Sequence, residues 1–219
     1  MEVSSVLNGP HVSAMSGNIK NIIIFLHGYG ADGNDLIGLA DPLKAIFKDT
    51  LFLSPHAPEP CAMSPMGRQW FDLTLRDPEE YWRGAEKAKP SLDQYLDDVI
   101  EQTNIPASKI SLVGFSQGTM MALHTGLRRE KQLASIVGFS GLLPMPKSAK
   151  IATNFTSKPP VQLIHGDLDA VVPVSATLAA ELSLKAHDVK VSKHICENVE
   201  HGISPEGLQV AAEFLSMYL

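Results

Sequence analysis

The chain has few cysteines and no long apolar run. Only two of its 219 residues are cysteine, Cys61 and Cys196, and their separation fits neither a zinc-binding nor a redox motif. A reduced, cytoplasmic location is the simplest expectation for such a protein. The longest apolar stretch, residues 22–26, is far too short to cross a bilayer. Residues 1–20 lack the basic start and apolar centre of a secretory signal, so we expect none.

A strong positive charge is also missing. The net charge is −6 at pH 7, and the few neighbouring Lys and Arg side chains are typical of solvated helix ends. Binding to nucleic acid requires clustered positive charge, so we expect no nucleic-acid partner. The eight histidines show no metal-ligand spacing. We therefore expect no metal ion.

The content of apolar residues is high enough for one sizeable hydrophobic core. Apolar residues make up 44% of the chain, and runs typical of strands alternate with helical patterns. This alternation predicts a mostly parallel sheet with helices on both faces, in a single α/β domain of residues 1–219. The predicted strands are residues 22–26, 51–53, 110–113, 134–139, 161–164 and 189–195. The predicted helices are residues 34–47, 117–129 and 175–185, one that begins at a capping box at 91–94, and one that begins at 204–206.

Residues 56–90 interrupt this regular alternation. They show no sustained periodicity and are rich in Pro, Met, Arg and Glu. Long loops inside a compact domain are usually active-site covers or disordered excursions. We predict a long loop that covers the active site, packed in part through Trp70 and Phe71.

The pentapeptide Gly114-Phe115-Ser116-Gln117-Gly118 follows a predicted strand and precedes a predicted helix. A serine at such a tight turn exposes its Oγ above the sheet, and the two glycines let neighbouring backbone come close. The amides at the start of the helix point toward the position where an oxyanion would develop. This context predicts Ser116 as the nucleophile of an α/β-hydrolase.

A nucleophilic serine needs a base, and the base needs an orienting carboxylate. In this fold the acid follows the serine in the chain and the histidine comes last. Of the two aspartates that follow the predicted strand 161–164, we choose Asp169 as the acid and expect Asp167 to brace the turn. His201 lies in the last loop before the final helix, so we prefer it over the other downstream histidines, His187 and His194.

An oxyanion hole requires two backbone amides. One should belong to Gln117, the residue after the nucleophile, and the other to the loop after an early strand. The segment Leu26-His27-Gly28-Tyr29-Gly30 lies at that place, and we predict the Tyr29 amide as the second donor.

Several short motifs follow one another along nearly the whole chain. They are residues 25–33, Ser54-Pro55-His56-Ala57-Pro58, Trp70-Phe71-Asp72, residues 114–118, residues 139–144, residues 165–173 and His201-Gly202-Ile203. In this order they resemble the phospholipase/carboxylesterase family, small α/β-hydrolases that include the acyl-protein thioesterases, and the first motif resembles the bacterial carboxylesterase branch. The resemblance implies an α/β-hydrolase fold, ester hydrolysis without a metal ion or organic cofactor, and the site residues predicted above. It also implies that Trp70 and Phe71 lie near the acyl pocket and that Leu142 and Leu143 form a wall of it.

The composition of one segment does not fit a pocket for long acyl chains. Residues 74–89 carry seven charged side chains before Lys89, where an apolar lining would be expected. We therefore expect a carboxylesterase that acts on short- to medium-chain esters. The alternatives are an acyl-protein thioesterase or lysophospholipase for longer chains and, more remotely, a non-catalytic binding protein of the same fold. The expected partner is a small ester or acylated substrate, and the expected state is a monomer or weak homodimer.

Overall fold

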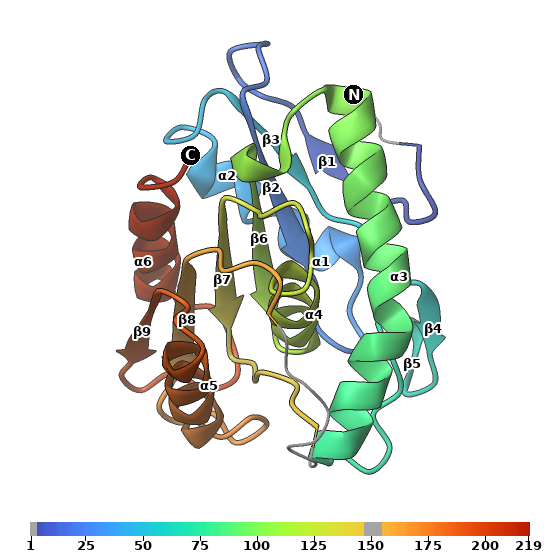
Figure 1. The fold of residues 1–219 in the computed structure, drawn as a ribbon, viewed down its shortest axis with the longest axis vertical. Coiled ribbons are helices and arrows are strands. Elements are labelled where there is room, and N and C mark those ends of the chain that lie inside the picture. Colours follow the sequence, from blue (N-terminus) through green and yellow to red (C-terminus); the bar gives the residue numbers. More distant parts are fainter. Residues whose placement is uncertain (1–3, 147–154) are drawn as a thin grey trace.

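The computed structural model describes residues 4–146 and 155–219. A seven-stranded sheet runs through the centre of the molecule in the order β1-β3-β2-β6-β7-β8-β9 (Figure 1). Every neighbouring pair is parallel except β1 and β3. The strands are β1 (His11–Val12), β2 (Asn21–Leu26), β3 (Thr50–Leu53), β6 (Ile110–Phe115), β7 (Ser135–Phe139), β8 (Val161–Gly166) and β9 (Val191–Cys196). The remaining strands, β4 (Glu59–Cys61) and β5 (Ser64–Gln69), form a separate hairpin.

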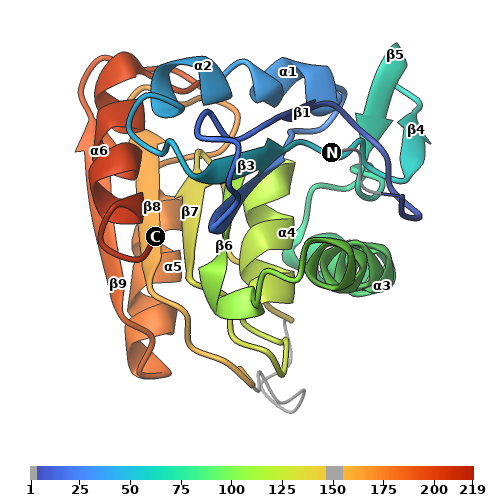
Figure 2. The same cartoon turned by 90° about the horizontal axis from the view of Figure 1, so that it is seen from above.

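Helices cover both faces of the sheet (Figure 2). Alternate residues of β2 point to opposite sides, so Ile22 and Ile24 belong to one buried cluster and Ile23 and Phe25 to the other. The first cluster includes α3 (Pro78–Thr103), α4 (Gln117–Gly126) and α5 (Ser175–Ala186). The second includes α1 (Gly33–Ile37), α2 (Ala40–Leu43) and α6 (Pro205–Leu215). A short 3-10 helix, Ala107–Lys109, precedes β6.

The predicted fold class is confirmed. Each of the six predicted strands overlaps an observed one, and the final helix begins at Pro205, as predicted. The Ser204 hydroxyl caps that helix by accepting a hydrogen bond from the Gly207 amide at 3.0 Å. The helix predicted over residues 34–47 is instead two short ones, α1 and α2.

The prediction of a long loop over residues 56–90 is wrong, and so is the helix start at residue 91. The segment contains the β4–β5 hairpin and the first half of α3. That helix begins at Pro78, where the Asp77 carboxylate accepts hydrogen bonds from two amides of the first turn. Pro90 lies inside the helix, where it removes a hydrogen bond at a cost of about 3 kcal/mol.

Packing of α3 against α4 explains why the helix continues through Pro90. The residues that α3 buries before the proline are Trp82, Ala85 and Ala88, and the same face continues beyond it with Leu92. Two of the first three are alanines, which give only a weak apolar signal in the sequence. Within residues 4–146 and 155–219, no helix has both the length and the apolar character required to span a membrane.

Candidate active site

The parallel strands all end at one edge of the sheet, which Figure 1 shows as the end to which their arrowheads point. Chains that leave parallel strands at this edge form the binding sites of open α/β sheets. The loops after β2, β7, β8 and β9 meet here, together with Ser116 after β6. The predicted site residues belong to these segments and to the start of α4, except for Trp70 and Phe71, which follow β5.

Ser116 lies at the turn from β6 into α4 and has a positive φ of 53°, with ψ at −115°. Such a backbone costs of order 1–3 kcal/mol for a residue with a side chain. Hydrogen bonds on both sides hold it: the Ser116 amide donates to the Phe139 carbonyl oxygen at 2.9 Å, and its own carbonyl oxygen accepts from the Thr119 amide at 3.0 Å. The turn is therefore held in place by β7 and by the first turn of α4.

The two glycines of the pentapeptide are required by close backbone approach. A Cβ added at Gly118 would lie 1.8 Å from the Leu26 carbonyl oxygen, and one at Gly114 would lie 2.5 Å from the Gly118 carbonyl carbon. No side chain fits in either space. This close approach of the backbone is the reason why the sequence pattern, with glycines on both sides of the serine, predicts a sharp strand-to-helix turn.

Asp169 and His201 come together from the loops after β8 and β9. His201 Nδ1 lies 2.7 Å from Asp169 Oδ2. Asp169 Oδ1 accepts hydrogen bonds from the Val171 and Val172 amides, each at 2.8 Å. The His201 ring also packs against Phe115, with centroids 4.9 Å apart, so it lies beside the residue that precedes Ser116.

The hydrogen bonds to Asp169 keep its side chain ionised although it is buried. Burial alone would raise the pKa of the Asp169 carboxyl, but the hydrogen bonds from His201 and from two backbone amides outweigh burial and hold the pKa below its ordinary value. An ionised carboxylate at His201 Nδ1 favours the proton on that nitrogen. His201 Nε2 is then free to accept a proton.

Asp167 does not approach His201 in this way. Its side chain is exposed, and Oδ1 accepts a hydrogen bond from the Val199 amide at 3.4 Å. Asp167 was expected to brace its own turn. It instead links that turn to the loop that carries His201.

The loop after β2 lies directly against Ser116, because a Cβ at Gly28 would be 3.4 Å from Ser116 Cβ. His27 is buried and orders this loop. Its Nε2 accepts from the Ala57 amide at 2.9 Å, so Nδ1 carries the proton and donates to the Gly28 carbonyl oxygen at 2.8 Å. Burial lowers the pKa of His27, which keeps the ring neutral. Since a peptide unit is planar and trans, the Tyr29 amide points away from His27.

The side chain of Gln117 has a role that sequence reasoning missed. The carboxamide is fully buried, with Oε1 accepting from the Trp70 amide at 3.0 Å and Nε2 donating to the Phe71 carbonyl oxygen at 2.7 Å. Trp70 Nε1 in turn donates to the His27 carbonyl oxygen at 3.1 Å. These bonds join three segments that are far apart in the chain. The sequence prediction used only the Gln117 backbone, because no local pattern reveals the partners of a side chain.

The predicted acyl-pocket residues lie in different environments. Leu142 and Leu143 line a largely apolar cavity of about 280 Å³ between the start of α3 and α5. A Cβ at Gly141 would lie 2.9 Å from the Ser116 carbonyl oxygen, so this wall begins beside Ser116. Phe71 lines a second, open groove of about 590 Å³. Trp70 lines neither of these two cavities and is buried.

Charged side chains dominate the groove beside Phe71, and each has a partner within the protein. The Glu80 carboxylate accepts hydrogen bonds from the amides of residues 74–76. Arg83 pairs with Glu79 at 2.8 Å, and Lys87 pairs with Glu59 at 2.7 Å. The walls of this groove therefore combine paired charges with the apolar surface of Phe71 and Leu75.

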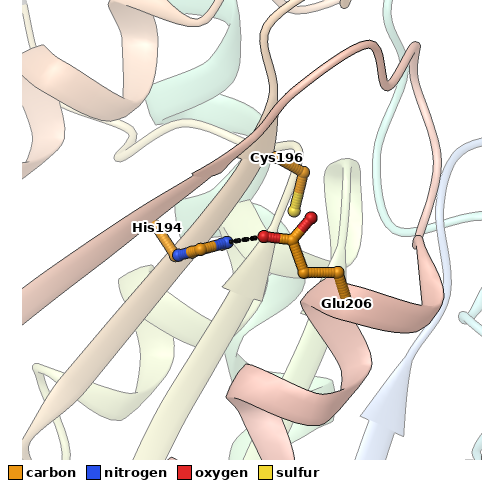
Figure 3. A group of neighbouring side chains, drawn as sticks. All are labelled: His194, Cys196 and Glu206. Atoms are coloured by element: carbon orange, nitrogen blue, oxygen red, sulfur yellow. Dashed lines mark hydrogen bonds and ion pairs between the residues drawn. The ribbon is translucent and has the colours of Figure 1, made fainter.

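One group of side chains among the described residues has the spacing to hold a metal ion (Figure 3). His194, Cys196 and Glu206 bring one potential ligand atom each within 4.8 Å of one another. His194 Nε2 lies 2.6 Å from Glu206 Oε1, and Cys196 is part of the apolar cluster against α6. The ion pair and the apolar packing account for all three side chains. The group could not be found from sequence spacing, because Glu206 lies on another element.

Fold and site together define an α/β-hydrolase. The chain belongs to the phospholipase/carboxylesterase family, whose sequence model matches residues 7–219.

Named relatives support the activity of the class. Acyl-protein thioesterase 1 of Saccharomyces cerevisiae is 30% identical, with 97% of this chain and 99% of the relative covered. Esterase YpfH of Escherichia coli is 27% identical, with 90% of this chain and 82% of the relative covered. The crystal structure of esterase PE8 superposes with a TM-score of 0.92 at 44% identity, covering 97% of this chain and 99% of that one. The chain is thus an ester or thioester hydrolase, as expected, and the remote alternative of a non-catalytic binding protein is set aside.

The buried Gln117 side chain generates a prediction about stability. Gln117→Ala leaves the Trp70 amide and the Phe71 carbonyl without partners, and we expect the free energy of unfolding to fall by about 2–4 kcal/mol. Urea denaturation followed by circular dichroism measures the loss. Gln209→Ala is the control, since Gln209 is exposed on α6 and its side chain donates to Glu213 on the same helix. A loss for Gln117→Ala as small as that of the control would contradict the bridging role.

Proposed function

We propose that the chain is a serine carboxylesterase that hydrolyses short- to medium-chain esters through an acyl-enzyme on Ser116. The observation that carries the proposal is the 2.7 Å bond between His201 and the buried Asp169, with the His201 ring packed beside the strained turn of Ser116. A nucleophile, base and orienting carboxylate in this order are the requirements of serine hydrolysis.

In the first half-reaction, Ser116 Oγ attacks the ester carbonyl carbon while His201 Nε2 takes the hydroxyl proton. The tetrahedral intermediate collapses when the bond to the leaving oxygen breaks, and the imidazolium returns the proton to the departing alcohol. Water then repeats the sequence on the acyl-enzyme, which releases the carboxylic acid and restores the Ser116 hydroxyl. Asp169 stays ionised throughout and stabilises the imidazolium.

We propose the Tyr29 and Gln117 amides as the donors to the intermediate's oxyanion. The Gln117 amide begins α4, where the helix dipole adds partial positive charge. The orientation of the Tyr29 amide rests on the His27 hydrogen bond to the Gly28 carbonyl. The proposed hole thus has one donor fixed by a helix and one fixed by a buried side chain.

The acyl chain is proposed to enter the cavity lined by Leu142 and Leu143. Its volume of about 280 Å³ is at the small end of ligand pockets, which span about 300–1,000 Å³. Each buried methylene contributes up to about 0.8 kcal/mol, so specificity should increase only while the apolar wall continues. We propose that Phe71 and the start of α3 act as the cover of the site, with the charged groove as its outer boundary.

A second candidate is hydrolysis of longer acyl chains, as thioesters of acylated proteins or as lysophospholipids. Two observations favour it: the yeast relative is named an acyl-protein thioesterase, and Met63, Met66 and Leu75 are exposed on the β4–β5 hairpin and the turn before α3. Exposed apolar side chains of this size can contact a lipid or an acyl group.

Some properties are proposed from composition and from the state of the cysteines. We propose a cytoplasmic location, which fits two buried, unpaired cysteines. We also propose that the protein acts on small ester or acylated substrates as a monomer or weak homodimer, without nucleic acid, metal ion or organic cofactor.

Ser116→Ala should lower kcat by at least about a thousandfold while the protein remains folded, because no acyl-enzyme can form. Hydrolysis of p-nitrophenyl butyrate measures the loss. A fluorophosphonate probe should label the unchanged protein at Ser116 and leave the variant unlabelled. Labelling at another serine would move the nucleophile elsewhere.

The two aspartates after β8 allow a matched pair of substitutions that tests which of them is the acid. Asp169→Asn should lower kcat roughly a thousandfold or more, since an amide favours the wrong imidazole tautomer. Asp167→Asn keeps an acceptor oxygen for the Val199 amide, and we expect less than about a threefold change, within the range of exposed surface substitutions. Steady-state kinetics of both variants test the assignment, and the reverse ranking would identify Asp167 as the acid.

Chain length separates the two candidate functions. We predict that kcat/KM rises from acetyl to roughly butyryl–octanoyl esters, and then levels or falls as the apolar wall ends. A series of p-nitrophenyl esters below their critical micelle concentrations, repeated with the matching thioesters, provides the measurement. A steady rise through palmitoyl would reject the short pocket and favour the long-chain thioesterase.

A further inference from the structure

A second histidine contacts the buried carboxylate, and it has no part in the reaction proposed above. His165 is the fifth residue of β8 and is buried. Its Nε2 lies 2.8 Å from the Val172 carbonyl oxygen and 3.1 Å from Asp169 Oδ2. Its Nδ1 lies 2.7 Å from the Thr177 hydroxyl on α5.

The hydrogen-bond partners of His165 determine its tautomer. A carbonyl oxygen can only accept, so the proton must be on Nε2, the nitrogen that faces Val172 and Asp169. In the neutral ring Nδ1 then accepts a hydrogen bond from the Thr177 hydroxyl. Thr177 is buried as well, so its hydroxyl is shielded from water. The ring is thus oriented from both sides.

Four nitrogen atoms surround the Asp169 carboxylate as a result. Two backbone amides donate to Oδ1 and His201 Nδ1 bonds Oδ2. His165 Nε2, whose hydrogen bond goes to the Val172 carbonyl, lies 3.1 Å from Oδ2 and places its partial positive charge there. Because the Asp169 side chain is completely shielded from solvent, no water can replace a donor that is lost.

His165 also acts on Asp169 through the loop. Val172 uses its amide to hold Asp169 Oδ1 and its carbonyl oxygen to accept from His165. The same ring therefore contacts the carboxylate directly and fixes the residue that holds its other oxygen.

We propose that His165 is a positioning residue, which holds Asp169 in the plane of the His201 imidazole and sets how strongly Asp169 attracts the proton of His201. This inference rests on the proposed function. A neutral N–H beside Oδ2 stabilises its negative charge and so weakens the pull of Asp169 on the His201 imidazolium. Loss of that N–H should make His201 more basic and less well oriented.

Charged side chains of the elements packed against β8 bond one another: Glu181 on α5 pairs with Lys185 and Lys193, and His194 on β9 bonds Glu206 on α6. Asp167 is exposed in the loop after β8, and Glu197 and Glu200 are exposed in the loop after β9. The end of β6 contributes the uncharged residues Phe115 and Ser116 to this region. The first turn of α5 contributes the uncharged Thr177. A change in the pH profile on substitution of His165 would therefore report on the pair Asp169 and His201.

The experiment compares two substitutions of His165. His165→Phe keeps the ring but removes both nitrogens, and His165→Gln keeps an N–H near the position of Nε2. For His165→Phe we expect kcat on p-nitrophenyl butyrate to fall about 10–100-fold, as for other residues that orient a catalytic group, with KM within about twofold. The acid limb of the kcat/KM profile should shift up by about half to one pH unit, the effect of one neutral hydrogen bond. His165→Gln should restore most of the rate and of the profile.

Two further variants keep the test decisive. Thr177→Val removes the hydroxyl that orients His165 and should cause a smaller change in the same direction, which tests the proposal if His165→Phe fails to fold. His194→Gln is the matched control, since His194 also bonds a carboxylate, and it should leave rate and profile unchanged.

Three outcomes would overturn the role of His165. They are a folded His165→Phe variant with unchanged kcat, one with lower stability but an unchanged pH profile, and a His165→Gln variant as impaired as His165→Phe. Fluorophosphonate labelling separates this failure from that of the proposed function. If the unchanged protein is labelled at Ser116 and the pH profile of the variants does not shift, only the role of His165 is rejected. If Ser116 is never labelled, the proposed function itself fails.

Discussion

The rest of the site depends on the turn at which β6 passes into α4 within one residue. Ser116 adopts a positive φ there, and the turn is possible only because Gly114 and Gly118 have no side chains to meet the neighbouring backbone. The strain costs of order 1–3 kcal/mol. It is offset by a hydrogen bond to β7 and by the buried apolar packing of both strands. The same close packing brings the loop after β2 against Ser116, so the proposed oxyanion donors come together because the turn is tight.

Buried polar groups around this turn are paired across segments far apart in the chain. The Gln117 carboxamide bonds residues 70 and 71, and His27 orders the loop after β2. Three hydrogen bonds hold the Asp169 carboxylate, whose side chain is shielded from solvent, and His165 Nε2 lies 3.1 Å from Oδ2. A buried polar group without a partner costs about 1–3 kcal/mol, so each of these pairs fixes its own geometry. A site of this kind is already organised before a substrate binds.

Sequence reasoning succeeded where the signal is local. The apolar run at residues 22–26 and the alternation of strands and helices predicted a parallel sheet, and the fold confirms it. It failed between residues 56 and 90. The strands β4 and β5 each contain a proline, which argues against a strand. Two of the residues that the first half of α3 buries are alanines, so its helical periodicity is weak in the sequence. Pro90 follows this half, and a proline normally indicates a helix boundary, so the continuation of the helix could not be recognised either.

The sequence by itself determined the positions of six strands along the chain, the glycines that allow the turn at Ser116, and the candidates Asp169 and His201 after later strands. These follow from local patterns and from the order in which parallel strands reach one edge of a sheet. Only the tertiary structure decided that α3 continues through Pro90, that the Gln117 side chain bonds residues 70 and 71, and that His165 contacts Asp169. The physical reason is that burial and hydrogen bonding depend on the partner. A histidine has the same local pattern whether it packs in the core or orients a carboxylate, and only the fold brings the carboxylate to it.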